Sequence, residues 1–257
     1  MRIVCLCNNW LGWQVLQWLR DQGQEIVGVV AHSAEQAKYL DEIRSVADRA
    51  GCVVLDDSVI LRPEGLEQVS SWNGDMAVSV LFRSILRQPF LNLFPKGCIN
   101  LHPAYLPYNR GAYPNVWSIV EKTPAGVTLH YIDEGLDTGD IIAQEEVTVE
   151  MTDTGATLYR KLELAALGLF QRTWPGIRSG DVRRRPQGVG PGSSHRKSDV
   201  GAIDEIDLER MYRAEDLINI LRARTFAPYP GAYFRHNGRK IYLRLELHDE
   251  PASGGDQ

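Results

Sequence analysis

Apolar and polar positions along the first two thirds of the chain fall into two repeating patterns. Short apolar runs alternate with longer stretches in which apolar residues recur every three or four positions, as on one face of a helix. The pattern predicts strands over residues 2–7, 25–31, 53–54, 75–80, 97–101, 127–132 and 141–149, and helices over residues 13–22, 34–50 and 154–178. Strands that alternate with helices are typical of βαβ units, so we expect an α/β fold with a Rossmann-like, mostly parallel sheet.

The pattern changes after residue 185. The run Gly188-Val189-Gly190-Pro191-Gly192-Ser193-Ser194 predicts a flexible loop or linker. A helix over residues 214–223 and a hairpin of residues 232–236 and 240–247 follow, with Asn237-Gly238 as the turn. We therefore expect a main domain over residues 1–185, a linker over 186–200 and a small C-terminal region over 201–257, disordered over residues 252–257.

Residues able to do acid–base chemistry follow two of the predicted strands. Asn100 and His102 are two positions apart, so their side chains project from the same face of an extended chain, and Pro103 then ends the strand. In open α/β sheets, ligands bind at the carboxyl ends of the strands. Gly135 and Gly139 permit a tight turn that brings carboxylates back to this edge. The sequence therefore predicts an active site over residues 97–140.

The residue types indicate a reaction class. Histidine exchanges a proton near neutral pH, and a neighbouring carboxylate raises the pKa of an imidazole and fixes its tautomer. An asparagine amide donates a hydrogen bond to an oxyanion as it forms. This set suits attack of an amine on a carbonyl carbon, because the amine itself is then the nucleophile.

Structural interpretations stand beside these functional ones. Asn100 also suits a strand-end cap and His102 an interior histidine; His130 suits a core position, and Asp140 a turn ligand. Arg183-Arg184-Arg185 indicates a solvated strand edge, and Arg110 suits either a surface ion pair or a ligand contact.

Two enzyme classes are disfavoured. The first strand-to-helix turn contains only Gly12, so the dinucleotide fingerprint is absent and a nicotinamide enzyme is the weaker analogue. His195 beside Ser193-Ser194 lacks a nucleophile-elbow context, which argues against a hydrolase triad.

The motifs resemble those of the folate-dependent formyltransferases. Members of that family carry Asn-x-His-x-x-x-x-Pro, Arg-Gly, Gly-Val-Thr and Gly-Leu-Asp-Thr-Gly-Asp in this order. Here these motifs read Asn100-Leu101-His102 to Pro107, Arg110-Gly111, Gly126-Val127-Thr128 and Gly135-Leu136-Asp137-Thr138-Gly139-Asp140. Several motifs in register are far more specific than one, and the resemblance covers residues 76–165 closely.

The resemblance implies a set of site residues. Asn100, His102 and Asp137 match the family's catalytic trio, and the formyl donor is 10-formyltetrahydrofolate, with no metal. The implied folate contacts are Ser84, Ile85, Leu86, Ala104, Tyr105, Leu106, Pro107, Asp133, Glu134, Gly135 and Leu136. Ala104 is often serine in relatives, so a hydroxyl contact is missing there.

The amino-acid sequence of residues 105–118 and 129–135 looks most like that of the nucleotide-sugar N-formyltransferases, which serve O-antigen and lipopolysaccharide biosynthesis. This resemblance implies that the acceptor is a nucleotide-linked amino sugar, for example a 4-amino-4,6-dideoxy sugar. The expected acceptor contacts are Asn8, Asn9, Trp10, Tyr108, Arg110 and Tyr229, with Arg196 or Lys197 for the pyrophosphate. The alternatives are a phosphoribosylglycinamide or methionyl-tRNA formyltransferase, or a non-catalytic folate or nucleotide binder.

Charge narrows these alternatives. The chain carries a net charge of −5, which does not indicate a broad nucleic-acid surface. Residues 201–257 contain eight Lys/Arg against ten Asp/Glu, a net charge of −2, which argues against a tRNA-gripping region.

Apolar runs and cysteines indicate the compartment. The apolar runs fall far short of the roughly 18 residues of a membrane helix, and the N-terminal one is too short for a signal peptide. Cys5, Cys7, Cys52 and Cys98 lack zinc-site spacing and are expected to be buried, reduced thiols, so we expect a cytoplasmic protein. The C-terminal helix and hairpin are apolar on one face and too small for their own core, so we expect a homodimer.

Overall fold

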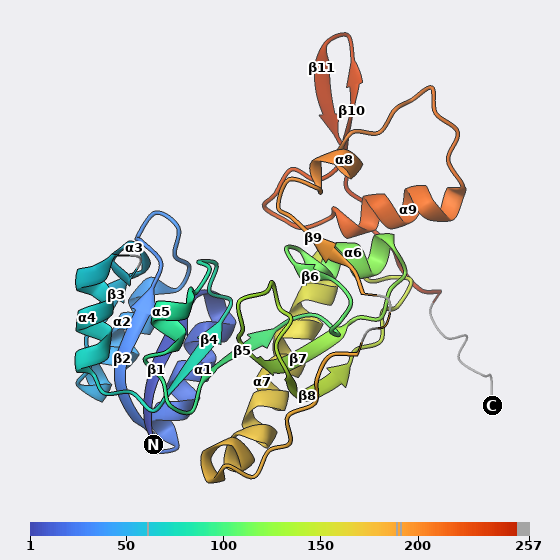
Figure 1. Cartoon of the computed structure of the whole chain (residues 1–257). Coiled ribbons are helices and arrows are strands. Elements are labelled where there is room, and N and C mark those ends of the chain that lie inside the picture. Colours follow the sequence, from blue (N-terminus) through green and yellow to red (C-terminus); the bar gives the residue numbers. More distant parts are fainter. Residues whose placement is uncertain (61, 189, 191, 251–257) are drawn as a thin grey trace, which may run out of the picture.

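The computed structural model describes residues 1–60, 62–188, 190 and 192–250, so the prediction for residues 252–257 lies outside the described residues. Its main sheet has the order β3-β2-β1-β4-β5-β7-β8 (Figure 1). The strands are β1 (Arg2–Cys7), β2 (Glu25–Ala31), β3 (Val54–Asp56), β4 (Met76–Val80), β5 (Cys98–His102), β7 (Gly126–Tyr131) and β8 (Ile141–Glu146). Neighbours from β3 to β5 pair in parallel, which confirms the predicted α/β fold.

Helices cover both faces of this sheet, and the side chains of β1 show why. Ile3, Cys5 and Cys7 belong to a core shared with α1 (Asn9–Asp21), α2 (Leu40–Ala50) and α7 (Gly155–Ser179), while Val4 and Leu6 belong to a second core. The second core includes residues of α3 (Asp57–Ile60), α4 (Pro63–Ser71) and α5 (Gln88–Leu91). Alternate side chains of a strand point to opposite faces, so a strand that is apolar at every position must be covered on both sides.

The last two strands of the sheet run in a direction that the sequence did not predict. β7 pairs antiparallel with β5, and β8 pairs antiparallel with β7. A parallel partner needs a long crossover that returns the chain to the same end of the sheet. The link from β5 to β7 contains only the short β6 (Arg110–Gly111) and α6 (Pro114–Val120), and the link from β7 to β8 is a turn.

Two helices begin at other residues than predicted. α1 begins at Asn9, directly after β1, so the residues predicted as a turn are already helical. The close approach of Gly12 to Cys7 permits this, because a Cβ at Gly12 would lie 3.2 Å from the Cys7 backbone. α2 begins at Leu40 rather than at residue 34, because Tyr39 adopts a left-handed conformation with φ of 58° that breaks the helix.

The segment predicted as a linker pairs with the main domain. β9 (Ser194–His195) forms a parallel pair with β6, and the Ser193 hydroxyl donates a hydrogen bond to Asn109 Oδ1. Arg185 forms an antiparallel bridge with Ile141. We call the described residues of 185–197 the strap, because they lie along the loop that follows β5.

The C-terminal region follows the sequence pattern closely. α9 (Ala214–Ala223) has the predicted bounds, and β10 (Tyr233–His236) and β11 (Arg239–Tyr242) form a hairpin that projects away from the main sheet (Figure 1). Asn237 and Gly238 both have positive φ, as a two-residue hairpin turn requires. A further short helix, α8 (Gly201–Asp204), precedes α9.

A buried arginine fastens α9 to the main domain. Arg222 is 4% exposed and donates hydrogen bonds to the backbone carbonyls of Glu150 and Asp153, each at 2.9 Å. Its Nε also donates to Asn219 Oδ1 at 2.8 Å. The two bonds to backbone carbonyls therefore hold the C-terminal helix against the residues that precede α7, and the bond to Asn219, within α9, orients the guanidinium.

The cysteines form no disulfide bonds. All four cysteines are free thiols: Cys5, Cys7 and Cys98 are buried, as expected, and Cys52 is half-buried. Within the described residues, no helix combines the length and apolar character that a membrane span requires.

Replacing Arg222 tests the attachment of α9. We expect Arg222→Met to lower the free energy of unfolding by about 2–4 kcal/mol, because two buried carbonyls lose their donor. Urea unfolding measures this change. Arg213→Met is the control, since this arginine has a side chain 77% exposed, and its effect should stay within about 0.5 kcal/mol. Equal effects of both substitutions would show that Arg222 does not fasten α9.

Candidate active site

A cleft of about 670 Å³ opens where the predicted site residues lie. Its floor is formed at the carboxyl ends of β1, β4 and β5, the edge at which open α/β sheets bind ligands. The predicted site residues that line it are Asn8, Asn9, Ser84, Ile85, Leu86, Asn100, His102, Asp133, Glu134, Gly135, Leu136 and Asp137, together with Arg196 and Lys197.

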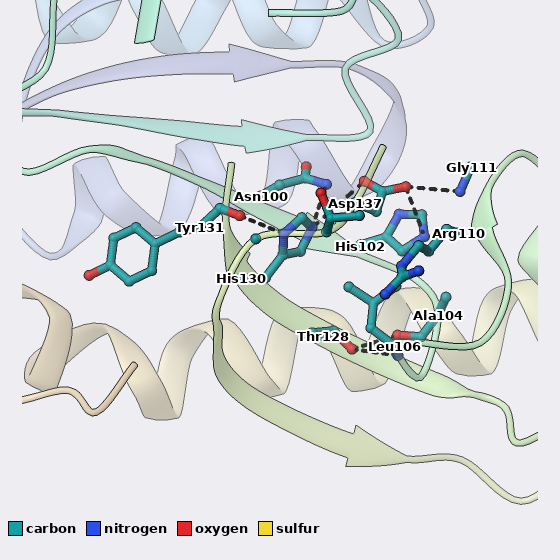
Figure 2. Close-up of polar contacts among 12 residues, drawn as sticks. Asn100, His102, Ala104, Leu106, Arg110, Gly111, Thr128, His130, Tyr131 and Asp137 are labelled. Atoms are coloured by element: carbon teal, nitrogen blue, oxygen red, sulfur yellow. Dashed lines mark hydrogen bonds and ion pairs between the residues drawn. The ribbon is translucent and has the colours of Figure 1, made fainter. Parts of the chain in front are cut away.

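A carboxylate and two histidines meet in this cleft (Figure 2). Asp137 Oδ2 lies 3.6 Å from His102 Nε2, and Asp137 Oδ1 lies 3.7 Å from His130 Nε2. The backbone N–H of Gly111 donates to Asp137 Oδ2 at 2.9 Å. A Cβ at Gly111 would lie 2.4 Å from the carbonyl oxygen of His195, so glycine is required for this approach. The predicted pair His102 and Asp137 therefore shares the site with an unpredicted histidine.

His130 has the core position that the sequence indicated and also lines the cleft, which the sequence did not predict. It is 1% exposed, and its Nε2 faces both Asp137 Oδ1, at 3.7 Å, and the amide of Asn100. Its Nδ1 donates to the Tyr131 carbonyl at 2.8 Å, which leaves Nε2 to accept from Asn100 Nδ2 at 3.2 Å. Burial lowers the pKa of His130 to about 4, so the ring is neutral at neutral pH. The pattern of apolar and polar residues in β7 did not indicate that His130 would contact Asn100 and Asp137.

The contact with His130 orients the amide of Asn100. One N–H points to the histidine, and the other has no hydrogen-bond partner among the described residues. Asn100 lines the cleft, so this second N–H suits an oxygen that carries developing negative charge. His102 and Asp137 beside it suit transfer of a proton.

Asp137 is held ionised although its side chain is only 15% exposed. Burial alone would raise the pKa of this carboxyl, but His102, His130, the Gly111 N–H and Arg110 together lower it below its ordinary value. Asp137 also has a φ of 53°, a left-handed conformation that costs a non-glycine residue about 1–3 kcal/mol. The surrounding contacts must therefore offset both costs.

The loop after β5 that was predicted to touch folate lies outside the cleft lining. None of Ala104, Tyr105, Leu106 and Pro107 lines the cleft, and Ala104 and Leu106 form a small buried cluster with Ile141. The Thr128 hydroxyl donates to the Ala104 carbonyl at 2.7 Å and accepts from the Leu106 N–H at 3.2 Å. These bonds pull the loop onto β7 and away from the cleft.

Four predicted acceptor contacts also lie outside the cleft lining. They are Trp10, Tyr108, Arg110 and Tyr229. The Trp10 ring is covered by Arg160 at 3.8 Å, and the Tyr229 hydroxyl accepts from Lys38 Nζ at 2.7 Å. The unpredicted polar and aromatic residues of the lining include Phe82, Arg83, Tyr113, Asn115, Tyr159 and His195. The positive charge of Arg83 is the signal that could have identified it. His195 was considered only for a hydrolase triad, and the other four resemble ordinary core or loop residues.

Three side chains fasten the loop that carries Ser84. His32 Nδ1 donates to Asp57 Oδ2 at 2.7 Å, and the Ser84 hydroxyl donates to the same oxygen at 2.6 Å. The Arg83 N–H donates to His32 Nε2 at 3.0 Å, and the ring of Phe82 stacks on His32. One edge of the cleft is therefore tied to β2 and α3.

No cluster of three or more His, Cys, Asp or Glu side chains with metal-binding geometry occurs among the described residues.

Two family models match the chain. Residues 1–172 match the formyl transferase model, and residues 199–249 match the N-formyltransferase dimerization C-terminal domain. The first match contains all of β1 to β8 and every residue of the cleft except those of the strap.

Individual relatives agree with these matches. The chain is 34% identical to the methionyl-tRNA formyltransferase of Geobacillus thermodenitrificans over 87% of this chain and 70% of that protein. It is 26% identical to a 4-N formyltransferase from Francisella tularensis, with a TM-score of 0.82 over 97% of this chain and 98% of that one. It is also 34% identical to the formyltransferase PseJ from Anoxybacillus kamchatkensis, with a TM-score of 0.57 over 79% of this chain and 89% of that chain. That structure was solved with UDP-4,6-dideoxy-4-formamido-L-AltNAc and tetrahydrofolate.

The bonds of Asp57 predict a pH-dependent stability. Burial alone would raise the pKa of this carboxyl, but its bonds from Ser84 and His32 lower it below its ordinary value. The stabilisation is therefore present above the unfolded pKa of about 3.9 and is lost as pH falls through the lower native value. We expect Asp57→Asn to cost about 1–2 kcal/mol at pH 7, and we expect the difference from the unsubstituted protein to shrink as the pH approaches about 3.

Urea unfolding at several pH values measures both quantities. Asp21→Asn is the matched control, because Asp21 is a helix-end carboxylate 51% exposed and bonded only to neighbouring surface residues. A difference that stays constant from pH 7 to about pH 3 would contradict the assignment.

Proposed function

The chain belongs to the formyl transferase family and is an N-formyltransferase, and from this premise we propose that it formylates the amino group of a nucleotide-linked 4-amino sugar. The proposed donor is 10-formyltetrahydrofolate. The observation that carries the reaction is the meeting of Asn100, His102 and Asp137 at the floor of one cleft. Formamido sugars of this kind are components of surface glycans such as the O-antigen of lipopolysaccharide, which is the pathway that we propose.

We favour a sugar as the acceptor because the chain resembles sugar-formylating enzymes over nearly its whole length. The Francisella 4-N formyltransferase matches 97% of it, including the C-terminal hairpin region, and the 34% identical PseJ was solved with a UDP-linked 4-formamido sugar. The net charge of −2 over residues 201–257 also disfavours a polyanionic acceptor. The 34% identity to a methionyl-tRNA formyltransferase makes the initiator tRNA the second candidate.

The cleft suits a folate donor. Its volume of about 670 Å³ lies within the usual range of small-molecule sites. Its lining includes the apolar side chains of Ile85, Leu86 and Leu136 and the polar turn of Asp133–Gly135, which suit a flat ring with a polar edge. In the proposal, Ser84–Leu86 and Asp133–Leu136 hold the folate, which supplies a formyl group activated for transfer.

The protein's own groups then have separate tasks. The free N–H of Asn100 and protonated His102 donate to the formyl oxygen, on which negative charge develops as the amine attacks. Asp137 stabilises the protonated ring of His102 and holds its orientation. The new N–C bond forms as the bond from the formyl carbon to the donor nitrogen breaks. The attacking amine loses one proton, and the donor nitrogen gains one.

Positive charge at the cleft mouth suits the acceptor's pyrophosphate. Arg83, Arg196 and Lys197 all line the cleft, and the N-terminus of α1 begins beside Asn8 and Asn9. Helix N-termini and cationic side chains both favour phosphate groups. In the proposal these groups bind the diphosphate and leave the sugar amine near Asn100 and His102.

The substrate prediction is tested with a panel of amines. We expect turnover with 10-formyltetrahydrofolate and a UDP- or dTDP-linked 4-amino sugar, measured by mass spectrometry of the formamido product. Nucleotide-linked 3-amino sugars, glycinamide ribonucleotide and charged initiator tRNA are the comparison substrates. Turnover on the tRNA alone would replace the sugar proposal by the second candidate.

The catalytic prediction concerns His102. We expect His102→Ala to lower kcat by about 10²–10⁴-fold, as removal of a general acid–base group does. Folate binding, measured by fluorescence titration, should change little, because the apolar end of the cleft is untouched. His248→Ala is the control, since this histidine is 75% exposed on the C-terminal region. Full activity of His102→Ala would exclude the proposed role.

We also propose a cytoplasmic homodimer formed through the C-terminal region, which the match to a dimerization domain supports. Large apolar side chains lie exposed there, including Met211 at 93%, Leu208 at 59% and Tyr242 at 49%. Sedimentation equilibrium at micromolar concentration should give twice the chain mass of 28.9 kDa. A mass of 28.9 kDa would contradict the dimer, and Met211→Asp should shift a dimer toward this value.

A further inference from the structure

The amide of Gln187 reaches the turn that carries Asp137. Its Nε2 donates to the backbone carbonyl of Asp137 at 2.8 Å and to that of Gly139 at 2.9 Å. Its Oε1 accepts a hydrogen bond from Arg110 Nη2 at 2.7 Å. Gln187 belongs to the strap, which comes 50 positions after Asp137 in the chain. Three of the four hydrogen bonds that a glutamine amide can make are thus directed at the residues that surround the carboxylate.

The turn needs such a partner. Asp137 adopts a left-handed conformation, and Gly139 lies so close to the Tyr131 carbonyl that it has no room for a side chain. This geometry directs the carbonyls of Asp137 and Gly139 to the same side. An amide nitrogen carries two N–H donors at a fixed angle, so one Gln187 side chain satisfies both carbonyls.

The other end of the same amide holds Arg110. The Nε of Arg110 is buried and has no hydrogen-bond partner among the described residues, so the bond to Gln187 is the contact that orients the guanidinium. The next residue, Gly111, donates its N–H to Asp137 Oδ2. Gln187 therefore fixes the backbone of Asp137 and also the segment that faces its carboxylate.

We propose that Gln187 is a positioning residue for formyl transfer: it holds Asp137 Oδ2 between His102 and the Gly111 N–H. This inference rests on the proposed function for its kinetic consequence. Gln187 does not line the cleft and so acts through Asp137 rather than on a substrate.

Other contacts dock the strap without Gln187. The Arg110 N–H donates to the Ser193 carbonyl and the Ala112 N–H to the His195 carbonyl, each at 2.9 Å. The Ser193 hydroxyl is bonded to both the N–H and the side chain of Asn109. Loss of the Gln187 amide should therefore release the Asp137 turn while the strap stays in place.

Two variants of Gln187 separate its bonds from its volume. Gln187→Met keeps the length of the side chain and removes all three hydrogen bonds, whereas Gln187→Glu keeps the shape and places a carboxylate against two carbonyls. We expect kcat to fall by about 10–100-fold in Gln187→Met, the effect of a small misplacement in a site, and further in Gln187→Glu. The Kd for folate should change less than kcat does, because Ser84–Leu86 stays in place and only Asp133–Leu136 adjoins the released turn.

The pH profile distinguishes positioning from general destabilisation. With Arg110 and Gly111 released, the pKa of Asp137 should rise, so the acid limb of kcat/KM should move to higher pH. The same shift should appear without turnover, as the carboxyl titration of Asp137 followed by ¹³C NMR, with Asp137→Asn to assign the signal. Ser193→Ala, which loosens the strap but leaves the amide of Gln187, should leave the titration unchanged.

Each outcome decides a separate question. Wild-type kcat and an unchanged Asp137 titration in a folded Gln187→Met protein would overturn the inference, as would equal shifts in Ser193→Ala. If Gln187→Met does not fold, Gln187→Glu carries the same two readouts. Absence of turnover on every amine by the unsubstituted protein would overturn the proposed function, while the titration would still decide whether Gln187 positions Asp137.

Discussion

One charged and mostly buried carboxylate is the constraint on which the other parts of this structure depend. Asp137 is mostly buried, sits in a left-handed conformation and is still held ionised. Burial opposes the charge, so the surroundings must supply compensating donors and cations. His102, at the end of β5, and the Gly111 N–H and Arg110, in the loop that follows β5, do so. The β5–β7 pair and the loop between these strands therefore serve to bring donors to a single oxygen pair.

The antiparallel direction of β7 has a chemical result. In the register of β5 and β7, Asn100 lies directly opposite His130. Side chains at opposed positions of paired strands lie on the same face at contact distance, so the register itself places the imidazole against the amide. A shift of one residue would turn His130 to the other face of the sheet. The orientation of a catalytic amide thus follows from backbone pairing.

The sequence predicted the features that depend on local pattern. Short apolar runs predicted all of the main strands, and Asn100 and His102 were found because a single strand carries both. His130 was missed because a lone histidine within an apolar strand looks like a core residue until its opposite strand is known. The loop of Ala104–Pro107 was assigned to folate from the motif, but the hydroxyl of Thr128, distant in sequence, draws it inward. Gln187 was not predicted, because it adjoins a run rich in glycine and proline. The composition of such a run indicates how flexible the chain is, but not which groups a single amide side chain bonds.

The position of the strap also determines where the C-terminal region of such a protein can be exchanged for another. A division of the chain by composition would cut near residue 186 and assign everything beyond to the small C-terminal region. Gln187, Ser193 and β9 lie beyond that cut, yet they bond to the loop of residues 107–112 and the turn of Asp137. The functional unit therefore extends through about Lys197, and natural or engineered exchange of C-terminal regions preserves the site only when the crossover falls after this residue.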